Sequence, residues 1–183
     1  MSRNTRIRCD MLRYARGVTL IELMITISVL ALLITLALPS YRTWIQNTQI
    51  RTAGEAIHSG MQLARAEAVR RNTTVQLVMG ASTDWTVSVA TAGGPGEQIQ
   101  ARPAADSPNA TITVTPAGAT TVTFSGLGRV APNFDGSNSM QQIDINTSVT
   151  IDSPRPLRVA LGTAGNTRFC DPAVAAPDPR ACF

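Results

Sequence analysis

The longest apolar run of the chain lies near its N-terminus, at residues 18–38, and Glu22 is the one charged residue within it. A helix rises about 1.5 Å per residue, so these 21 residues cover roughly 31 Å, close to the ~30 Å of bilayer hydrocarbon. The run therefore predicts an uncleaved transmembrane helix. A cleaved secretory signal is the alternative, but the run is longer than a usual signal core and no clear small-x-small site follows it.

A second helical pattern follows Pro39, where we expect the first helix to continue with a kink, because a proline removes one helical hydrogen bond and bends the axis. Beyond it, small and apolar side chains recur at spacings of three and four, which is one face of a helix. These positions are Ile50, Ala53, Ile57, Met61, Ala64 and Ala68. We expect this small-sided face to lie close against its cover, and the helix to end near Asn72.

After residue 72 the pattern changes to short β-branched runs separated by Gly, Pro, Asn and Asp, which predicts strands joined by turns. The runs lie at residues 73–80, 85–90, 110–116, 120–126, 141–147 and 156–162. We interpret residues 91–110 as a loop or hairpin tip and residues 131–139 as another loop. The expected fold class is α+β, with one long N-terminal helix whose second half packs on an antiparallel, β-rich head at residues 73–183.

The net charge of the chain is concentrated at its N-terminus. All 16 basic residues are arginines, and the chain carries a formal net charge of +4. Residues 1–17 hold five arginines and one aspartate, which leaves 11 arginines and 11 acidic residues, and so no net charge, in the rest. The basicity therefore does not indicate nucleic-acid binding. It predicts a cytoplasmic N-terminus, with residues 39–183 on the opposite side of the membrane.

The cysteines agree with this orientation. Cys9 lies in the arginine-rich segment, whereas Cys170 and Cys182 lie together near the C-terminus. In an oxidising compartment, two cysteines that close a 13-residue loop most simply form a disulfide. Metal binding by two cysteines alone is the less favoured alternative, so we expect a C-terminal disulfide loop and neither a metal nor a cofactor.

The stretch RGVTLIELM, residues 16–24, raises the question of why Glu22 stands at the start of an apolar run. Thr19-x-x-Glu22 matches the capping box of a helix start. Alternatively, Glu22 lies near enough to the end of the run to reach the membrane interface. Neither interpretation explains why the arginine-rich segment ends in Gly17 directly before the apolar run.

Residues 16–40 resemble the class III signal and N-terminal helix of type IV pilins and pseudopilins. The resemblance implies that a prepilin peptidase cleaves after Gly17, which removes residues 1–17 as a leader. It also implies that the peptidase methylates the new N-terminus, Val18, where most members of the family have phenylalanine. The partners implied are this peptidase, other pilin or pseudopilin subunits and an inner-membrane assembly platform.

In the same resemblance Glu22 matches the glutamate at the fifth position of the mature chain, and Pro39 matches the helix-bending proline. Residues 18–38 would then form the transmembrane and filament-core helix, and residues 39–72 its amphipathic half. A carboxylate in hydrocarbon costs roughly 2.5–3.5 kcal/mol on insertion scales. The resemblance implies that the free α-amine of a neighbouring subunit neutralises it, so that Glu22 sets the register of stacked helices.

The head resembles the FimT/GspH family of minor pilins and pseudopilins over residues 63–78, 122–132 and 156–172. Members with a role in DNA uptake typically show Gly-Arg-x-Arg before the first C-terminal cysteine. Here the sequence is Gly165-Asn166-Thr167-Arg168, so the second arginine is matched and the first is replaced.

Four arginines near the C-terminus are candidate contacts to double-stranded DNA: Arg155, Arg158, Arg168 and Arg180. With two to four phosphate contacts at most, such binding is expected to be weak and strongly dependent on salt. The alternative is that Arg155 and Arg158 are solvated strand residues and that Arg168 pairs with Asp171.

The sequence predicts a protein that is not an enzyme, because His58 is the one histidine and no phosphate loop, nucleophile motif or metal cluster accompanies it. We expect a minor pilin of type IV pili that aids assembly, held in the inner membrane with its head in the periplasm and then in the pilus. The runner-up is an H-type minor pseudopilin of type II secretion. A membrane-anchored periplasmic domain without a filament role is a third interpretation, which a lack of processing by prepilin peptidase would favour.

Overall fold

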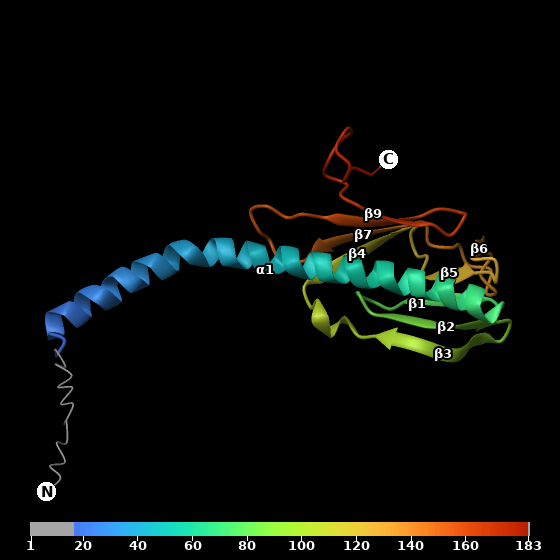
Figure 1. The fold of residues 1–183 in the computed structure, drawn as a ribbon, viewed down its shortest axis with the longest axis horizontal. Coiled ribbons are helices and arrows are strands. Elements are labelled where there is room, and N and C mark those ends of the chain that lie inside the picture. The colour runs from blue at the N-terminus through green and yellow to red at the C-terminus, as the bar shows by residue number, and fades with distance from the viewer. Residues whose placement is uncertain (1–16, 183) are drawn as a thin grey trace, which may run out of the picture. The chain divides into compact units, whose positions relative to one another are not determined.

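The computed structural model describes residues 17–182, and the chain divides into two units, residues 1–39 and 40–183. One helix, α1 (Leu20–Arg71), contributes to both (Figure 1). In the first unit the side chains of residues 17–39 are exposed, and the apolar window of α1 has a mean hydropathy of 2.5. By length and composition this part of α1 is able to cross a membrane. The leader predicted at residues 1–17 lies outside the described residues except for Gly17.

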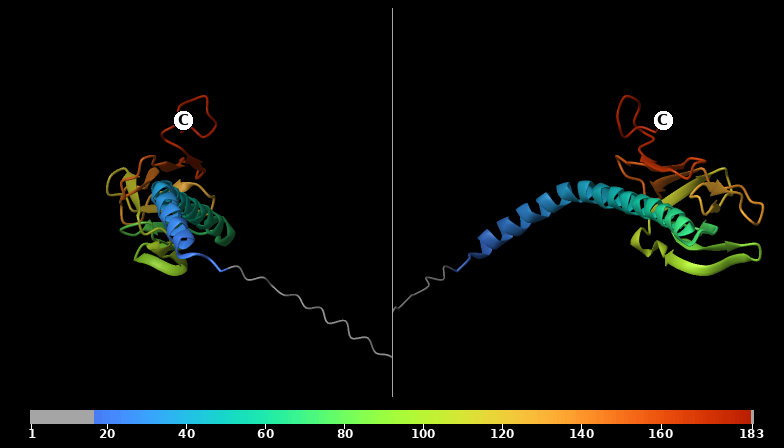
Figure 2. Two further views of the ribbon diagram at one scale, coloured as in Figure 1. Left: turned by 90° about the vertical axis from the view of Figure 1, so that its left-hand side faces the viewer. Right: turned by 45° about the vertical axis from the view of Figure 1, so that its right-hand side comes forward.

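The second unit holds two antiparallel sheets. The first has the strand order β3-β2-β1-β5-β6, and the second has the order β4-β7-β8-β9. The first sheet comprises β1 (Val75–Met79), β2 (Trp85–Thr91), β3 (Gly94–Arg102), β5 (Thr121–Phe124) and β6 (Val130–Ala131). The second comprises β4 (Ala110–Thr115), β7 (Gln142–Thr147), β8 (Leu157–Leu161) and β9 (Thr167–Cys170). Residues 40–71 of α1 lie against both sheets (Figures 1 and 2). The expected α+β fold is confirmed.

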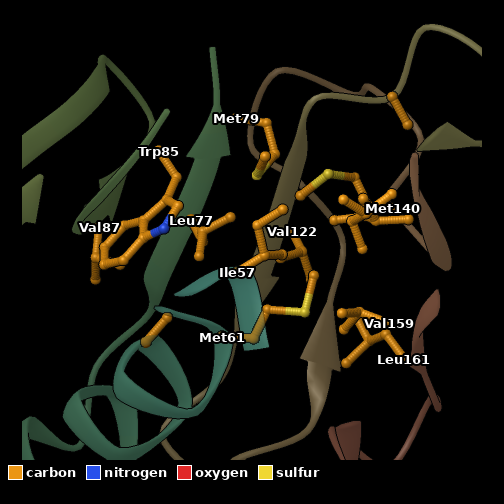
Figure 3. Packing of buried hydrophobic residues seen from close by; sticks show 14 of the residues in the cluster. Ile57, Met61, Leu77, Met79, Trp85, Val87, Val122, Met140, Val159 and Leu161 are labelled. Atoms are coloured by element: carbon orange, nitrogen blue, oxygen red, sulfur yellow. The ribbon is translucent and has the colours of Figure 1, made fainter. Parts of the chain in front are cut away.

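The predicted helical face of α1 forms the centre of the core. All six of its positions, from Ile50 to Ala68, are buried. Figure 3 shows Ile57 and Met61 of α1 among side chains of both sheets. Every buried residue of this apolar cluster lies between Ile50 and Leu161, so the second unit contains a core of its own. From here on we use the word head for the second unit, including its part of α1. The head has a complete core, so it is expected to fold without residues 17–39.

Two glycines of α1 let aromatic rings from both sheets approach the helix backbone. A Cβ at Gly54 would lie 2.6 Å from Cε2 of Phe169 in β9. A Cβ at Gly60 would lie 2.9 Å from Cε2 of Trp85 in β2. Both distances are too short for real contacts, which confirms that the small-sided face lies close against its cover.

Six strands occupy the predicted runs. Residues 91–110, expected to be a loop or hairpin tip, do contain the turn of the β2–β3 hairpin, but most of the segment is not loop. Nine of these residues form β3, which pairs with β2. β3 is an edge strand with mostly exposed side chains, so it lacks the apolar alternation that marks a half-buried strand. Gly94, Pro95 and Gly96 suggest a turn, yet an edge strand tolerates them because its outer backbone groups need no partner. A short 3-10 helix, η1 (Ala104–Asp106), follows.

Two further strands, β6 and β9, were not predicted. They are two and four residues long and complete the edges of the two sheets. The turns that precede them meet one another, because Val130 N donates to Thr163 O over 3.3 Å. At this junction Gly165 adopts a φ of +80°, and a Cβ there would collide with the carbonyl oxygen of Gly128.

Candidate functional site

The N-terminal motif lies at the start of α1. Gly17 and Val18 are exposed, and the backbone N–H of Glu22 donates to Oγ1 of Thr19 over 3.2 Å, which is one half of a capping box. The Glu22 carboxylate is exposed and makes no hydrogen bond or ion pair with any of residues 17–182. Pro39 lies inside α1, which continues through it. The kink, the cleavage site and the role of Glu22 stay predictions.

About two turns after Pro39, polar side chains of α1 hold the loops of the second sheet. Asn47 does this twice: its Nδ2 donates to Ser153 O over 3.1 Å, and its Oδ1 accepts from Arg155 N over 2.9 Å. Gln46 is buried and accepts from Oγ1 of Thr147 over 3.0 Å. The segment that carries Arg155 is therefore fixed against the helix.

The C-terminal loop is tied back onto β9. Cys170 and Cys182 form a disulfide with a Cα–Cα distance of 5.3 Å. Within the loop, Asp171 N donates to Arg180 O over 2.8 Å. Because these bonds fix both ends of the loop, its side chains hold a defined position beside α1.

Between α1 and this loop lies a hollow of about 510 Å³, which we call the C-terminal groove. It is lined by Trp44, Asn47, Thr48, Arg51, Arg155, Leu157, Phe169, Cys170, Asp171, Pro179 and Arg180. Leu157 and Phe169 supply apolar surface. Trp44 is 63% exposed, stacked with Tyr41 at a ring distance of 6.0 Å. Three arginines and one aspartate make the lining basic.

The structure divides the four candidate arginines into two pairs. Arg155 and Arg180 both line the C-terminal groove. Side chains alternate along a strand, and Phe169 contacts α1, so its neighbour Arg168 lies on the opposite face of the second sheet. Cys170, two positions after Arg168, lies on the same outer face. Arg158 pairs with Cys170 across the sheet, so Arg158 shares that face. The predicted set is therefore not one surface.

The pair on the outer face is engaged with the protein. Arg158 binds Asp144 of β7 through two hydrogen bonds of 2.6 and 3.1 Å. Arg168 donates to Ala181 O over 3.2 Å. The expectation that Arg158 is simply solvated was wrong, since the register of β7 and β8 places a carboxylate directly opposite it. The pairing of Arg168 with Asp171 stays a prediction, while its bond to Ala181 O ties it to the disulfide loop.

The arginines of the groove are more available. Among residues 17–182 the Arg155 guanidinium has no hydrogen bond or ion pair, and its side chain is exposed. Arg180 pairs with Asp178 over 2.8 Å, and this hydrogen bond lowers the pKa of Asp178 to about 2. Arg51 pairs with Glu55 over 2.7 Å on the exposed face of α1. Sequence reasoning missed Arg51, because an (i, i+4) pair on a helix gives no signal of a groove formed with residues a hundred positions away.

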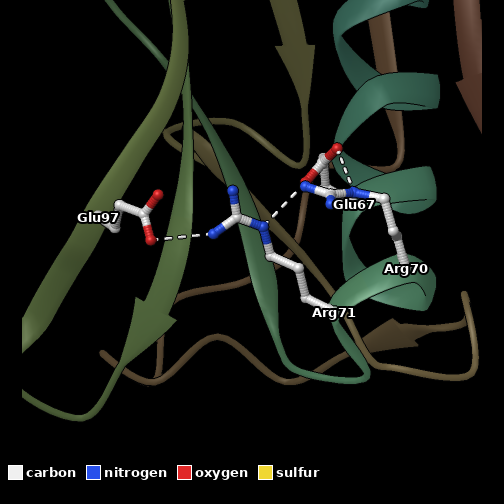
Figure 4. Close-up of polar contacts among 4 residues, drawn as sticks. All are labelled: Glu67, Arg70, Arg71 and Glu97. Atoms are coloured by element: carbon white, nitrogen blue, oxygen red, sulfur yellow. Dashed lines mark hydrogen bonds and ion pairs between the residues drawn. The ribbon is translucent and has the colours of Figure 1, made fainter.

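A second cluster of charges lies at the end of α1 (Figure 4). Glu67 accepts hydrogen bonds from Arg70 and from Arg71, and Arg71 also pairs with Glu97 of β3 over 2.9 Å. The bonds from Arg70 and Arg71 lower the pKa of the Glu67 carboxyl to about 2. The pair with Glu97 joins the helix to the edge strand β3.

Within the described residues no three His, Cys, Asp or Glu side chains are grouped to hold a metal ion. Nor does the C-terminal groove contain a nucleophile with an adjacent base. An exposed apolar helix that continues into a helix packed on antiparallel sheets, with a basic surface groove, has the features of a structural and binding protein.

Comparison with known families agrees with this class. The family described as type II transport protein GspH matches residues 53–173, and the prokaryotic N-terminal methylation motif matches residues 12–38. The first match covers well over half of the chain, so the chain belongs to the GspH family of pilin-like proteins. Proteins of this family and fold are structural pilins, which assemble with other pilins and are not enzymes.

One solved structure with a TM-score above 0.5 shows the fold, and a second, weaker similarity accompanies it. The type IV minor pilin FimU of Pseudomonas aeruginosa superposes with a TM-score of 0.51 at 17% identity, over 76% of this chain and 99% of that one. The minor pseudopilin EpsH from the type 2 secretion system of Vibrio cholerae gives a TM-score of 0.48 at 11% identity, over 69% and 99%. A search of curated protein sequences found no match.

Proposed function

We propose that this chain is a minor subunit of type IV pili, which helps the filament assemble and contacts double-stranded DNA during uptake. Before assembly, residues 18–38 span the inner membrane and the head lies in the periplasm, where the inner-membrane assembly platform acts on the subunit. Prepilin peptidase cleaves after Gly17 and methylates Val18. The arginine-rich segment before the apolar run and the match to the methylation motif support this topology and processing.

The observation that carries the DNA contact is the grouping of three arginines around the C-terminal groove. The Arg155 guanidinium has no partner among residues 17–182, so it is able to bind a phosphate without giving up a bond. Arg51 and Arg180 are in exposed ion pairs, and such pairs contribute only about 0–1 kcal/mol. A phosphate is therefore able to replace the carboxylate partners of these two arginines at little cost.

The test is a salt titration of double-stranded DNA binding by residues 46–183, which contain the whole buried core. Three phosphate contacts predict that affinity falls about 40-fold between about 50 and 200 mM salt. We expect Arg155→Ala to weaken binding and reduce the slope of log K against log salt by about 1. Arg129→Ala is the matched control, because this exposed arginine lies on the turn before β6 and removes the same charge.

Binding that is lost equally in the control would mean a diffuse charge effect and would contradict a site at the groove. No binding at low salt, with the disulfide intact, would remove DNA uptake from the proposal. It would favour the second candidate, an H-type minor pseudopilin of type II secretion. The apolar part of the groove, with Leu157, Phe169 and Trp44, supports that candidate because it suits a protein partner better than a phosphate backbone.

A further inference from the structure

The turn between β5 and β6 carries an unusual side chain. We call residues 125–129 the Leu127 turn, after the leucine at its tip. Leu127 is 82% exposed, more than any other large apolar side chain among residues 17–182. Turn tips normally carry Gly, Asn, Asp or Ser, which are well solvated and adopt turn conformations easily. Leu127 does not stabilise the fold by burial, because its side chain lies in solvent and outside the core.

The Leu127 turn is held in one conformation by its own backbone and by α1. Gly128 N donates to Ser125 O, and Ser125 N donates to Arg129 O, each over 2.8 Å. From α1, Nε of Arg65 donates to Gly128 O over 3.0 Å. A side chain displayed on a rigid turn loses little conformational freedom when it binds, so Leu127 is suited to act as an anchor.

The β8–β9 turn supports the Leu127 turn from the other side. Gly165 packs directly on the carbonyl of Gly128, and Val130 N donates to Thr163 O. Gly126 in turn lies against Asn72 at the end of α1, where a Cβ would come within 2.8 Å of the Asn72 Oδ1. Both α1 and the β8–β9 turn therefore hold the loop that presents Leu127.

The surface beside the turn is apolar and basic. A hollow of about 620 Å³ is lined by Gln62, Arg65, Ala66, Val69, Arg70, Asn166 and Thr167, and Val69 is 52% exposed there. Arg65 and Val69 both approach Gly128, which joins this hollow to the Leu127 turn. Arg129 is exposed on the turn itself. The arginines here are Arg65, Arg70 and Arg129. Only Glu67, which pairs with Arg70 (Figure 4), opposes them, so the local net charge is positive.

We propose that the Leu127 turn docks into an apolar pocket with a carboxylate rim on a different pilin subunit of the same filament. This rests on the proposed function, because filament assembly supplies the partner. Leu127 and Val69 supply the apolar contact, and Arg129 and Arg65 supply the charges that the carboxylates match.

Two hollows of this chain do not match the charges of the Leu127 turn, so they would not seat the turn of a second copy. The C-terminal groove is lined by three arginines and only one aspartate, and it would repel Arg129. Another hollow, formed by Ala56, Ser59, Leu63, Trp85, Gln100 and Arg102, contains an arginine and no acid. These charges therefore favour a non-identical subunit over a second copy.

The experiment measures binding of this head, residues 46–183, to the purified heads of the other pilin subunits encoded by the same organism. We expect one of them to bind, and Leu127→Ser to weaken that binding about 10-fold or more, because burial of a leucine is lost. Phe134→Ser is the matched control, since Phe134 is an apolar side chain, 51% exposed, on the loop after β6, and its binding should stay within about twofold. Arg129→Glu should weaken the same complex, and an acid-to-arginine change on the partner should restore it.

Equal binding by the wild-type and Leu127→Ser heads would overturn the inference, as would self-association of this head as the one complex found. Incorporation of the full chain into filaments, measured in parallel, distinguishes a failure of this inference from a failure of the proposed function. If the wild-type chain enters filaments while Leu127→Ser binds normally, the inference fails and the proposed function stands. If the wild-type chain is neither processed nor incorporated, both fail.

Discussion

At Gly165 the backbone lies at a φ of +80°, and the carbonyl oxygen of Gly128 occupies the space where a side chain would begin. Two independent costs therefore oppose any other residue here, the left-handed backbone and the collision. Gly118 has the same φ of +80° but nothing within 4 Å of a Cβ, so it isolates the first cost. Substitutions at Gly165 and Gly118 therefore separate the cost of backbone strain from the cost of the steric collision.

We predict that Gly165→Ala lowers the free energy of unfolding of the head by about 3 kcal/mol or more, and Gly118→Ala by about 1 kcal/mol. Urea denaturation of residues 46–183 measures both. Equal losses in the two variants would mean that the contact between the β8–β9 turn and the Leu127 turn relaxes without cost.

Glu67 makes the stability of the head depend on pH in the acid range. Its pKa is lowered from 4.5 to about 2 by hydrogen bonds from Arg70 and Arg71, so the folded state favours the ionised carboxylate. A lowered pKa contributes stability above the ordinary value, and this contribution is lost as the pH falls from 4.5 towards 2. We predict that Glu67→Gln lowers the melting temperature at neutral pH and makes the decline in this acid range shallower.

The control for this prediction is Glu55→Gln, which removes an exposed (i, i+4) pair with Arg51 alone. Because such pairs contribute little, its melting profile should follow that of the wild type. Identical acid profiles for wild type and Glu67→Gln would show that the helix end does not depend on this carboxylate.

At the scale of elements, the parts with a strong period were predictable. Residues 50–68 of α1 show the helical period on one face, and six strands show β-branched runs, because each of these elements buries a side against the core. β3 gave no such signal. It buries little and is held by its hairpin pairing with β2 and by the Arg71–Glu97 ion pair, and neither of these leaves an apolar alternation along the chain.

The candidate site was predictable only in part for a related reason. Arg155 and Arg180 meet because the disulfide and the Asn47 hydrogen bonds bring two segments to α1. Arg158 is excluded from their surface by strand alternation and by Asp144 on the neighbouring strand. Neither the groove nor the place of Arg51 in it follows from a pattern along the chain.

The C-terminal loop is the element most dependent on a single covalent bond. A 13-residue loop closed by a disulfide contributes about 3 kcal/mol in the chain-entropy account. We predict that changing both Cys170 and Cys182 to serine lowers the free energy of unfolding of the head by about this amount. Urea denaturation with and without reductant provides the control, since reductant should bring the wild type to the value of the variant and leave the variant unchanged. A reductant effect on the variant would contradict the assignment.

At the scale of the whole molecule, the proposed role of Glu22 is in assembly and not in membrane insertion. We predict that Glu22→Leu still inserts and is still cleaved after Gly17, because the apolar run becomes longer. It should fail to enter filaments, because the neighbouring α-amine loses its partner. Leader removal is measured by mass and incorporation by immunoblot of sheared filaments.

Ser28→Leu is the matched control, since it also makes the same helix more apolar, and the Ser28 hydroxyl donates to Met24 O of its own helix. This variant should be processed and incorporated normally. Normal incorporation of Glu22→Leu would remove the registry role of the glutamate.

The buried apolar cluster is drawn entirely from residues 50–161, and the side chains of residues 18–38 contribute nothing to it. If the subunit passes from the membrane into a filament, as we propose, the head needs no refolding on the way. Only the surroundings of the first part of α1 would change in that transfer, from acyl chains to neighbouring helices. The work of extracting the subunit would then be done against the membrane rather than against the fold.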